Sequence, residues 1–227
     1  MRPSAIGLLL LAPHAAMAFF FSSAPGQRRS DIYPQFFEAL PDMAGKAVAV
    51  TGASRGLGYV TALSLAKKGA FVLLLSRPSA QSAESQARIA EAARDAGSTA
   101  PPPVQVDCNL LDFQSVRAAA ATVTELLAAT GGGGLDVLCL NAGIMLQPDV
   151  ASKDGYDITA STNMLSHFLL TRELLPELRR AETSRGGECP IAPIEPMNTH
   201  TRQLSLCSMR PVYFCCIGIR QRHAWSR

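Results

Sequence analysis

Several features that mark common classes of binding protein are scarce or missing in this chain of 227 residues. None of its six cysteines stands in a Cys-x-x-Cys pair, which argues against a zinc site and a disulfide scaffold, and we expect no metal ion. The formal net charge is only +3 and the arginines are scattered, so the sequence does not predict a nucleic-acid partner. With 48% apolar and 17% charged residues the composition is that of a globular protein. The length suits one α/β domain with a core and is too short for two large domains.

Acidic residues are absent from the first thirty positions. Arg2 precedes an apolar run over residues 5–12 that is too short to span a bilayer comfortably, and the small-residue pattern Ala16-Met17-Ala18 follows, as in a secretory signal. The next stretch contains phenylalanine, serine and arginine and again lacks acid, so residues 1–30 resemble the bipartite address of proteins imported into complex plastids. We expect residues 1–30 to be a targeting segment, with residues 1–18 cleaved. The predicted destination is the plastid, and the alternative is the endoplasmic reticulum or its membrane.

Apolar runs separated by helical patterns predict the body of the protein. Residues 31–44 form an expected N-terminal arm with a short helix bracketed by Pro34 and Pro41. From residue 45 to 183 the order is strand, helix, strand, helix, which predicts a parallel sheet with helices on both faces. The predicted strands are 47–50, 70–75, 104–107 and 135–140, the predicted helices between them include 82–96 and a helix capped by Asp112 that runs to about Ala129, and the glycines 131–134 are expected to form a loose loop.

The first strand runs directly into a glycine-rich turn and then a helix. The free N–H groups and the positive dipole end of such a helix face an anion, so the turn predicts a phosphate site. Gly52 permits the tight turn, Gly56 the close approach of a diphosphate, and Gly58 the contact between helix and strand. Thr51 and Ser54 add hydroxyl groups, and Arg55 adds a positive charge beside the phosphates. The residues predicted to hold a diphosphate and ribose are Gly52, Ser54, Arg55, Gly56, Leu57 and Gly58.

The end of the second strand predicts which dinucleotide is bound. An acidic residue at this place hydrogen-bonds the 2′-hydroxyl of NAD. Here the strand ends in Ser76-Arg77 and the nearest acid is Glu84. Because an arginine pairs well with a 2′-phosphate, Arg77 predicts NADP as the cofactor, with NAD as the alternative. A solvated Arg77 at the start of a loop, without a ligand, is the competing interpretation.

Three motifs in order carry a resemblance to a known family. The glycine spacing G-x-x-x-G-x-G over 52–58, the Asn141-Ala142-Gly143 triplet after the fourth strand and the helix containing Asn163 resemble the short-chain dehydrogenase/reductase family, and within it the retinol-dehydrogenase-like and protochlorophyllide-reductase-like members. The resemblance implies a doubly wound, Rossmann-type parallel sheet that is incomplete at its C-terminal side. It also implies hydride transfer between NADP(H) and a carbonyl, an alcohol or a conjugated double bond of a small molecule.

The resemblance further implies roles for single residues. Asp107 and Cys108 would flank the adenine ring. The triplet Asn141, Ala142 and Gly143 would steady the sheet and line the nicotinamide side, and Asn163 would be the catalytic asparagine. We interpret His167, on the same helix, as a packing or interface residue rather than a catalyst. The family's dimer surface lies partly on this helix, so a homodimer through an exposed apolar face of the helix is expected.

The family's proton donor is missing from its expected place. A tyrosine with a lysine four residues later should follow Asn163, but the last lysine of the chain is Lys153 and no tyrosine has lysine at that spacing. From residue 184 to 227 the chain is an irregular tail whose prolines bar a central strand, and Ser205 or Ser208 lies too far on to replace the family's serine. We favour a mis-spliced or mistranslated tail. A genuine NADP-binding protein without catalysis and a structural protein on a relict fold are the alternatives.

Overall fold

The computed structural model describes residues 32–185. The predicted targeting segment 1–30 and the tail from residue 186 onward, with Ser205 and Ser208, lie outside the described residues. The chain divides between Leu40 and Pro41 into two units. The described part of the first unit is α2 (Ile32–Ala39), in which the rings of Tyr33 and Phe37 stack with centroids 6.3 Å apart. Pro34 lies in the first turn of this helix, where its missing N–H has no helical partner to lose, and does not bracket the helix as predicted.

The second unit is built on a four-stranded parallel sheet, as the sequence predicted. Its strands are β1 (Ala47–Thr51), β2 (Phe71–Ser76), β3 (Val104–Asp107) and β4 (Val137–Cys139), in the order β3-β2-β1-β4. Val50 of β1 stands beside Leu74 on one side and Cys139 on the other. A parallel sheet with β1 next to its centre, and with β2 and β4 on either side, is the doubly wound arrangement expected for residues 45–183.

Strand β4 is shorter than the predicted run 135–140, because the groups at both of its ends bond elsewhere. The N–H of Leu135 donates to the carbonyl of Glu177 at 3.0 Å, and the N–H of Asn141 donates to the side chain of Thr51 at 2.9 Å. Among residues 32–185, β4 has a hydrogen-bonded neighbour on one side only, so the described sheet ends there.

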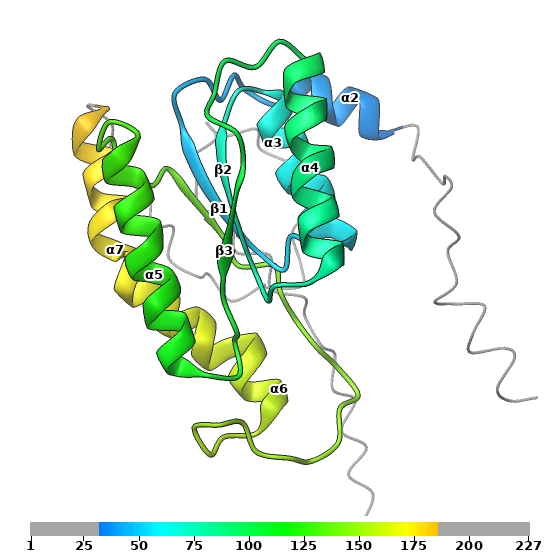
Figure 1. Ribbon diagram of the computed structural model, residues 1–227, viewed down its shortest axis with the longest axis vertical. Helices are drawn as coiled ribbons and strands as arrows, with labels where there is room; N and C mark the ends of the chain where they lie inside the picture. Colours follow the sequence, from blue (N-terminus) through cyan, green and yellow to red (C-terminus); the bar gives the residue numbers. More distant parts are fainter. Residues whose placement is uncertain (1–31, 186–227) are drawn as a thin grey trace, which may run out of the picture. The chain divides into compact units, whose positions relative to one another are not determined.

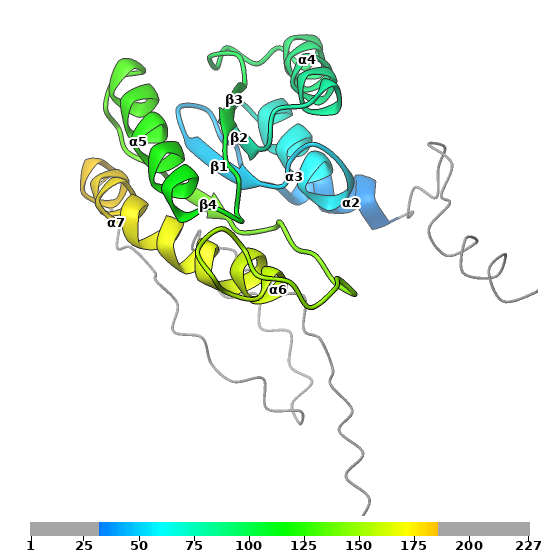
Figure 2. The same cartoon turned by 60° about the horizontal axis from the view of Figure 1, so that its bottom comes forward.

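Helices cover both faces of the sheet (Figure 1). On one face lie α3 (Gly56–Lys67) and α4 (Ala80–Asp95), and on the other lie α5 (Phe113–Ala129) and α7 (Ser166–Ser184). Figure 2 shows α5 and α7 side by side along their length, with α6 (Ile158–Ala160) leading through the π-helical turn η1 (Ser161–Leu165) into α7. Strand residues alternate between the two cores: Val48, Val50, Val72 and Leu74 pack with α3 and α4, whereas Ala49, Leu73 and Leu75 pack with α5 and α7.

Short polar side chains determine where two of the helices begin. Asp112 caps α5 as predicted, because its carboxylate accepts the N–H of Gln114 at 2.9 Å. Helix α4 begins at Ala80, two residues before the predicted start, because Ser79 forms a reciprocal capping box with Ser82.

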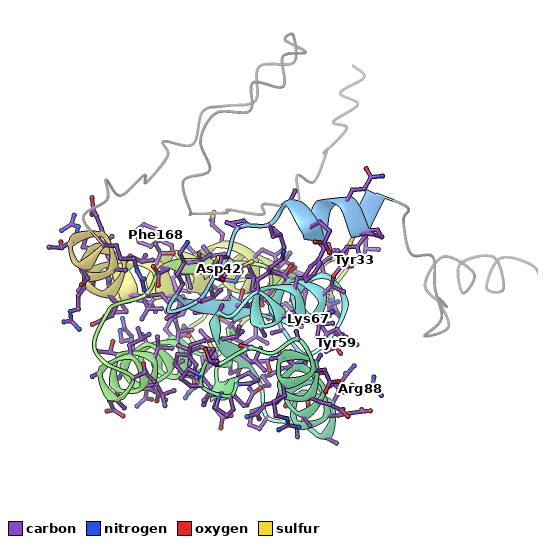
Figure 3. All side chains as sticks on the ribbon, turned by 90° about the horizontal axis from the view of Figure 1, so that it is seen from above. Tyr33, Asp42, Tyr59, Lys67, Arg88 and Phe168 are labelled. Carbon is purple, nitrogen blue, oxygen red and sulfur yellow. The ribbon has the colours of Figure 1, made fainter. Side chains whose placement is uncertain are left out.

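One face of the helix after Asn163 is exposed and apolar, as the sequence predicted. Met164 is 61% and Phe168 70% exposed in the described chain. Figure 3 shows Phe168 on the side of α7 that is turned away from α5. None of the described helices is long and apolar enough to cross a bilayer.

The last glycine of the run 131–134 departs from the loose loop that the sequence predicted, whereas Gly131 and Gly132 have open surroundings. Gly134 has a positive φ of 83°, and a Cβ built there would overlap the backbone nitrogen of Ala181 and the carbonyl oxygen of Glu177. The loop therefore passes directly against α7, and only glycine fits at this approach.

We predict that Gly134→Ala lowers the free energy of unfolding far more than Gly97→Ala does. Both glycines have positive φ, at 83° and 77°, so both changes bring backbone strain of about 1 kcal/mol. A Cβ at Gly97 meets nothing within 4 Å, whereas one at Gly134 also forces α7 aside at a further cost of about 1–3 kcal/mol. Urea unfolding of the full chain and both variants measures the difference. Equal losses would show that the packing of Gly134 against α7 contributes nothing.

Candidate functional site

The carboxyl ends of the four parallel strands meet at one edge of the sheet, and the predicted site residues gather there. The glycine turn 52–58 follows β1, Arg77 follows β2, Cys108 follows β3, and the triplet 141–143 follows β4. Ligands of open α/β sheets bind outside this edge, near the point where the strand order reverses. Here the order reverses between β1 and β4, so the glycine turn and the triplet 141–143 flank that point.

The turn after β1 has the form of an anion-binding loop. Gly52 and Gly56 have φ values of +67° and +60°, which side chains rarely tolerate. Helix α3 begins at Gly56, and the side chain of Arg55, at the N-cap, makes no capping hydrogen bond. A Cβ built on Gly56 meets no atom within 4 Å, so the space beside the first turn of α3 is open. Uncapped N–H groups that face open space at a helix N-terminus suit a phosphate.

Gly58 allows α3 to approach the turn after β4. A Cβ at this position would overlap the amide nitrogen of Asn141 and the carbonyl oxygen of Gly52. The same Asn141 amide donates to the carbonyl of Thr51 at 3.0 Å and to that of Gly52 at 3.5 Å. Because Gly58 has no side chain, α3 can lie close both to the Asn141 side chain and to the end of the first strand.

Thr51 does not face the phosphate side as expected, because its hydroxyl is buried and turned toward the triplet after β4. The hydroxyl oxygen accepts the N–H of Asn141 at 2.9 Å and the N–H of Ala142 at 3.0 Å. Thr51 is 1% exposed, and the two residues that donate to it are half-buried. This side chain and the amide of Asn141 together tie the first and fourth strands at the site.

Asn163 lies in the π-helical turn η1 and holds the chain beyond the triplet. Its amide oxygen accepts the N–H of Ile144 at 2.9 Å, and its amide nitrogen donates to the carbonyl of Ile144 at 2.8 Å. A single π-helical turn inside a helix often marks a functional site. The asparagine, a poor former of helices, is placed here because its amide reproduces the two hydrogen bonds of a neighbouring strand.

The segment between Ile144 and Asn163 is fastened to the start of α5. Lys153 pairs with Asp112 at 2.5 Å, and the carboxylate of Asp154 accepts the N–H of Phe113 at 2.8 Å. The ring of Tyr156 lies against that of Phe113, with centroids 5.6 Å apart. These contacts fix the approach of the chain to η1.

His167 is buried, and both of its ring nitrogens lie close to oxygen atoms of other residues. Its Nε2 lies 3.1 Å from the Thr51 hydroxyl and its Nδ1 lies 3.4 Å from the carbonyl oxygen of Asn163. Burial lowers the pKa of His167, and the hydrogen bond to the Asn163 carbonyl opposes this only in part. The contact with Thr51 was missed by the sequence reasoning, because the two residues are 116 positions apart and no spacing links them.

The remaining predicted residues lie at the same edge. Arg55 and Arg77 are both exposed, and neither forms an ion pair within residues 32–185. Asp107 is exposed beside Ser76, its register partner at the end of β2. The thiol of Cys108 is buried, and burial raises its pKa to about 11, so it stays protonated at neutral pH and is a packing group rather than a nucleophile. Over the described part of the chain, no three His, Cys, Asp or Glu side chains gather as metal ligands.

Comparison with known proteins identifies the family. The model of the short chain dehydrogenase family matches residues 46–188, which is more than half of the chain. The chain therefore belongs to the short-chain dehydrogenase/reductase family, whose members are oxidoreductases that bind nicotinamide dinucleotides.

Individual relatives agree with this assignment. An uncharacterized oxidoreductase of Schizosaccharomyces pombe is 41% identical over 156 residues, which cover 68% of this chain and 43% of the relative. Retinol dehydrogenase 14 of Mus musculus is 37% identical over 145 residues, which cover 63% of this chain and 43% of the relative. The crystal structure of an uncharacterized protein from Mycobacterium paratuberculosis is 35% identical with a TM-score of 0.51, over 62% of this chain and 46% of that chain. The chain thus spans less than half the length of these proteins.

We predict that the stability of the protein falls as the pH drops below about 6.5, in part because of His167. The pKa of His167 is lowered in the folded state, so as the pH falls the unfolded chain takes up the proton at a higher pH than the folded chain does. Between the ordinary histidine pKa and the lower folded pKa, each further decrease in pH therefore favours unfolding. His167→Gln cannot titrate, so its melting temperature should depend less on pH between about 7 and 5. The other three histidines remain in both proteins and cancel in the comparison. Identical pH slopes would contradict the buried neutral imidazole.

Proposed function

We propose that this chain is the dinucleotide-binding part of an NADP(H)-dependent oxidoreductase of the short-chain type. The observation that carries the proposal is the first turn of α3, which is uncapped, begins at a glycine of positive φ and faces open space. The nicotinamide ring supplies the hydride chemistry when the cofactor is bound.

The diphosphate would lie at the N-terminus of α3. Gly56 lets an anion reach the backbone N–H groups there, and Leu57, which is 68% exposed, would shield the ribose side from water. Ser54 is held by a hydrogen bond from the Ser85 hydroxyl to its carbonyl at 2.8 Å, which fixes the turn without using the Ser54 hydroxyl. Asp107 and Cys108 would flank the adenine, and the triplet 141–143 would line the nicotinamide side.

The exposed arginines favour NADP over NAD. Neither Arg55 nor Arg77 is neutralised by an acid among residues 32–185, so both charges are available to a 2′-phosphate. At the end of β2 the chain offers Ser76 and Arg77 rather than the acid that would bind the 2′-hydroxyl of NAD and repel a phosphate.

The substrate reaction is proposed as reversible hydride transfer between NADP(H) and a carbonyl or alcohol. The name of the mouse relative, retinol dehydrogenase 14, favours this over reduction of a conjugated double bond. Asn163 would serve by holding the backbone at Ile144 beside the nicotinamide side. Plastid import and a homodimer through the exposed face of α7 remain proposals.

A second function is favoured by one feature of the sequence. A proton donor must accompany the hydride, and the chain has no Tyr-x-x-x-Lys pair. A protein that binds NADP without turnover fits this feature. Calorimetric binding together with an assay of NADPH oxidation with aldehydes separates the two functions: binding with turnover supports the oxidoreductase, and tight binding without turnover supports the second function. No binding at all would reject both.

We predict that Gly56→Ala weakens NADP binding roughly tenfold or more, by removing a charge-assisted hydrogen bond to the diphosphate. The added methyl group meets no protein atom, so it acts on the ligand's space and on the backbone strain of a φ of +60°. Gly97→Ala is the matched control, since Gly97 also has a positive φ and open surroundings but follows the C-terminal end of α4, outside the proposed site. Titration calorimetry should find normal affinity for the control. Equal affinity of both variants would remove the diphosphate from this turn.

We predict that Arg77→Asp reverses the preference between the two dinucleotides. Loss of a charge-assisted pair with the 2′-phosphate should weaken NADP binding roughly tenfold to a hundredfold, while an aspartate can accept a hydrogen bond from the 2′-hydroxyl of NAD. Arg94→Asp makes the same charge change at an exposed position in the last turn of α4 and should leave the ratio unaltered. An unchanged ratio of NADP to NAD affinity in Arg77→Asp would refute the NADP assignment.

A further inference from the structure

His167 is a buried residue of α7, one turn after Asn163, and its ring lies against the end of β1. His167 is 6% exposed, and both of its ring nitrogens have oxygen neighbours. Nε2 faces the Thr51 hydroxyl at 3.1 Å and Nδ1 faces the Asn163 carbonyl at 3.4 Å. The imidazole therefore connects two parts of the proposed dinucleotide site that are far apart in the sequence.

The direction of the hydrogen bond follows from the capacity of the hydroxyl. A threonine hydroxyl has one proton to donate and two lone pairs to accept with. Two backbone N–H groups, of Asn141 and Ala142, already donate to this oxygen at 2.9 and 3.0 Å. A third donor would have no lone pair to meet, so Nε2 of His167 is the acceptor and Thr51 is the donor.

Two acceptors compete for the hydroxyl proton. The carbonyl oxygen of Cys139 lies 3.4 Å from the Thr51 oxygen, whereas Nε2 of His167 lies at 3.1 Å. The nearer acceptor forms the stronger hydrogen bond, so the Thr51 proton is directed to Nε2. With Nε2 accepting, a neutral ring carries its proton on Nδ1, which points at the carbonyl of Asn163.

We propose that His167 is a positioning residue of the dinucleotide site, which in its Nδ1–H form fixes the rotation of the Thr51 hydroxyl so that both lone pairs face the turn at Asn141 and Ala142. This inference rests on the proposed function, because the turn is taken to line the nicotinamide side. An apolar side chain of similar size would fill the space but would leave the Thr51 proton free to turn toward the Cys139 carbonyl. The lone pairs would then no longer face the two N–H groups.

The protonation of the ring is tested on the full chain labelled with ¹⁵N-histidine. At neutral pH the signal that disappears in His167→Gln should show a protonated Nδ1 and an unprotonated Nε2. Protonation at Nε2 would overturn the proposal, since Thr51 would then be the acceptor. This measurement needs no ligand and no activity.

The effect on the site is tested by dinucleotide titration of a set of variants. His167→Leu should weaken NADP binding roughly tenfold, whereas His167→Gln, whose amide oxygen can accept the Thr51 proton, should stay within about threefold of the unchanged chain. In a Thr51→Val background, His167→Leu should have no further effect, because its partner is gone. Leu174→Ala, in the core face of α7, is the control that lowers the melting temperature without changing the affinity of the folded protein.

The outcomes distinguish the positioning role of His167 from the proposed binding of a dinucleotide. If His167→Leu weakens binding equally with and without the Thr51 hydroxyl, or if His167→Gln fails to restore it, His167 is only a packing residue. If the unchanged chain binds no dinucleotide, the proposed function fails. The nitrogen spectrum and the same double-mutant cycle, read as melting temperatures, then still decide the contact between His167 and Thr51.

Discussion

The hydroxyl of Thr51 accepts two hydrogen bonds from the turn after β4, beyond the point where the pairing of β1 with β4 ends. Strand β4 ends at Cys139, so the N–H groups of Asn141 and Ala142 have no place in a ladder with β1. An unpaired donor costs about 1–3 kcal/mol when it is buried, and less at half-buried positions such as these. One oxygen, at the last residue of β1, accepts both. The turn after β4 is thereby held against the turn after β1, and the Asn141 amide, which donates to the carbonyl of Thr51, adds to this contact.

That contact explains why small residues surround it. Once the two turns touch, the space between them has no room for side chains: a Cβ at Gly52 lies 3.0 Å from Ala142, and one at Gly58 would overlap the Asn141 amide. Glycine is thus required at these two positions by the protein itself. At Gly56 the protein leaves open space, because a Cβ there would meet no protein atom. Glycine is still favoured by the positive φ, and open space beside such a turn suits a ligand. Under the proposed function, the spaced glycines combine two packing constraints, at Gly52 and Gly58, with one binding constraint at Gly56.

Features that depend on residues near one another in the chain could be predicted from the sequence, whereas features that depend on contacts between distant residues could not. The strands, the cap at Asp112 and the turn at Gly52 follow from residues near one another, so they were predicted within a few positions. The length of β4 could not be predicted, because its ends are determined by Glu177 and Thr51, which are distant in the chain. The tight fit of Gly134 and the direction of the Thr51 hydroxyl depend in the same way on helix α7, whose placement no local pattern gives.

The described residues are suited to binding rather than to proton transfer. Holding a dinucleotide needs backbone N–H groups, glycine and fixed positive charge, and these lie at the edge of the sheet. Among residues 32–185, the buried titratable groups do not offer a proton to that edge. Both nitrogens of His167 are engaged, burial keeps the Cys108 thiol protonated with a pKa of about 11, and Glu177 pairs with Arg180 beside the N-terminal end of β4. Under the proposed function, the proton that accompanies the hydride therefore comes from a group other than these three.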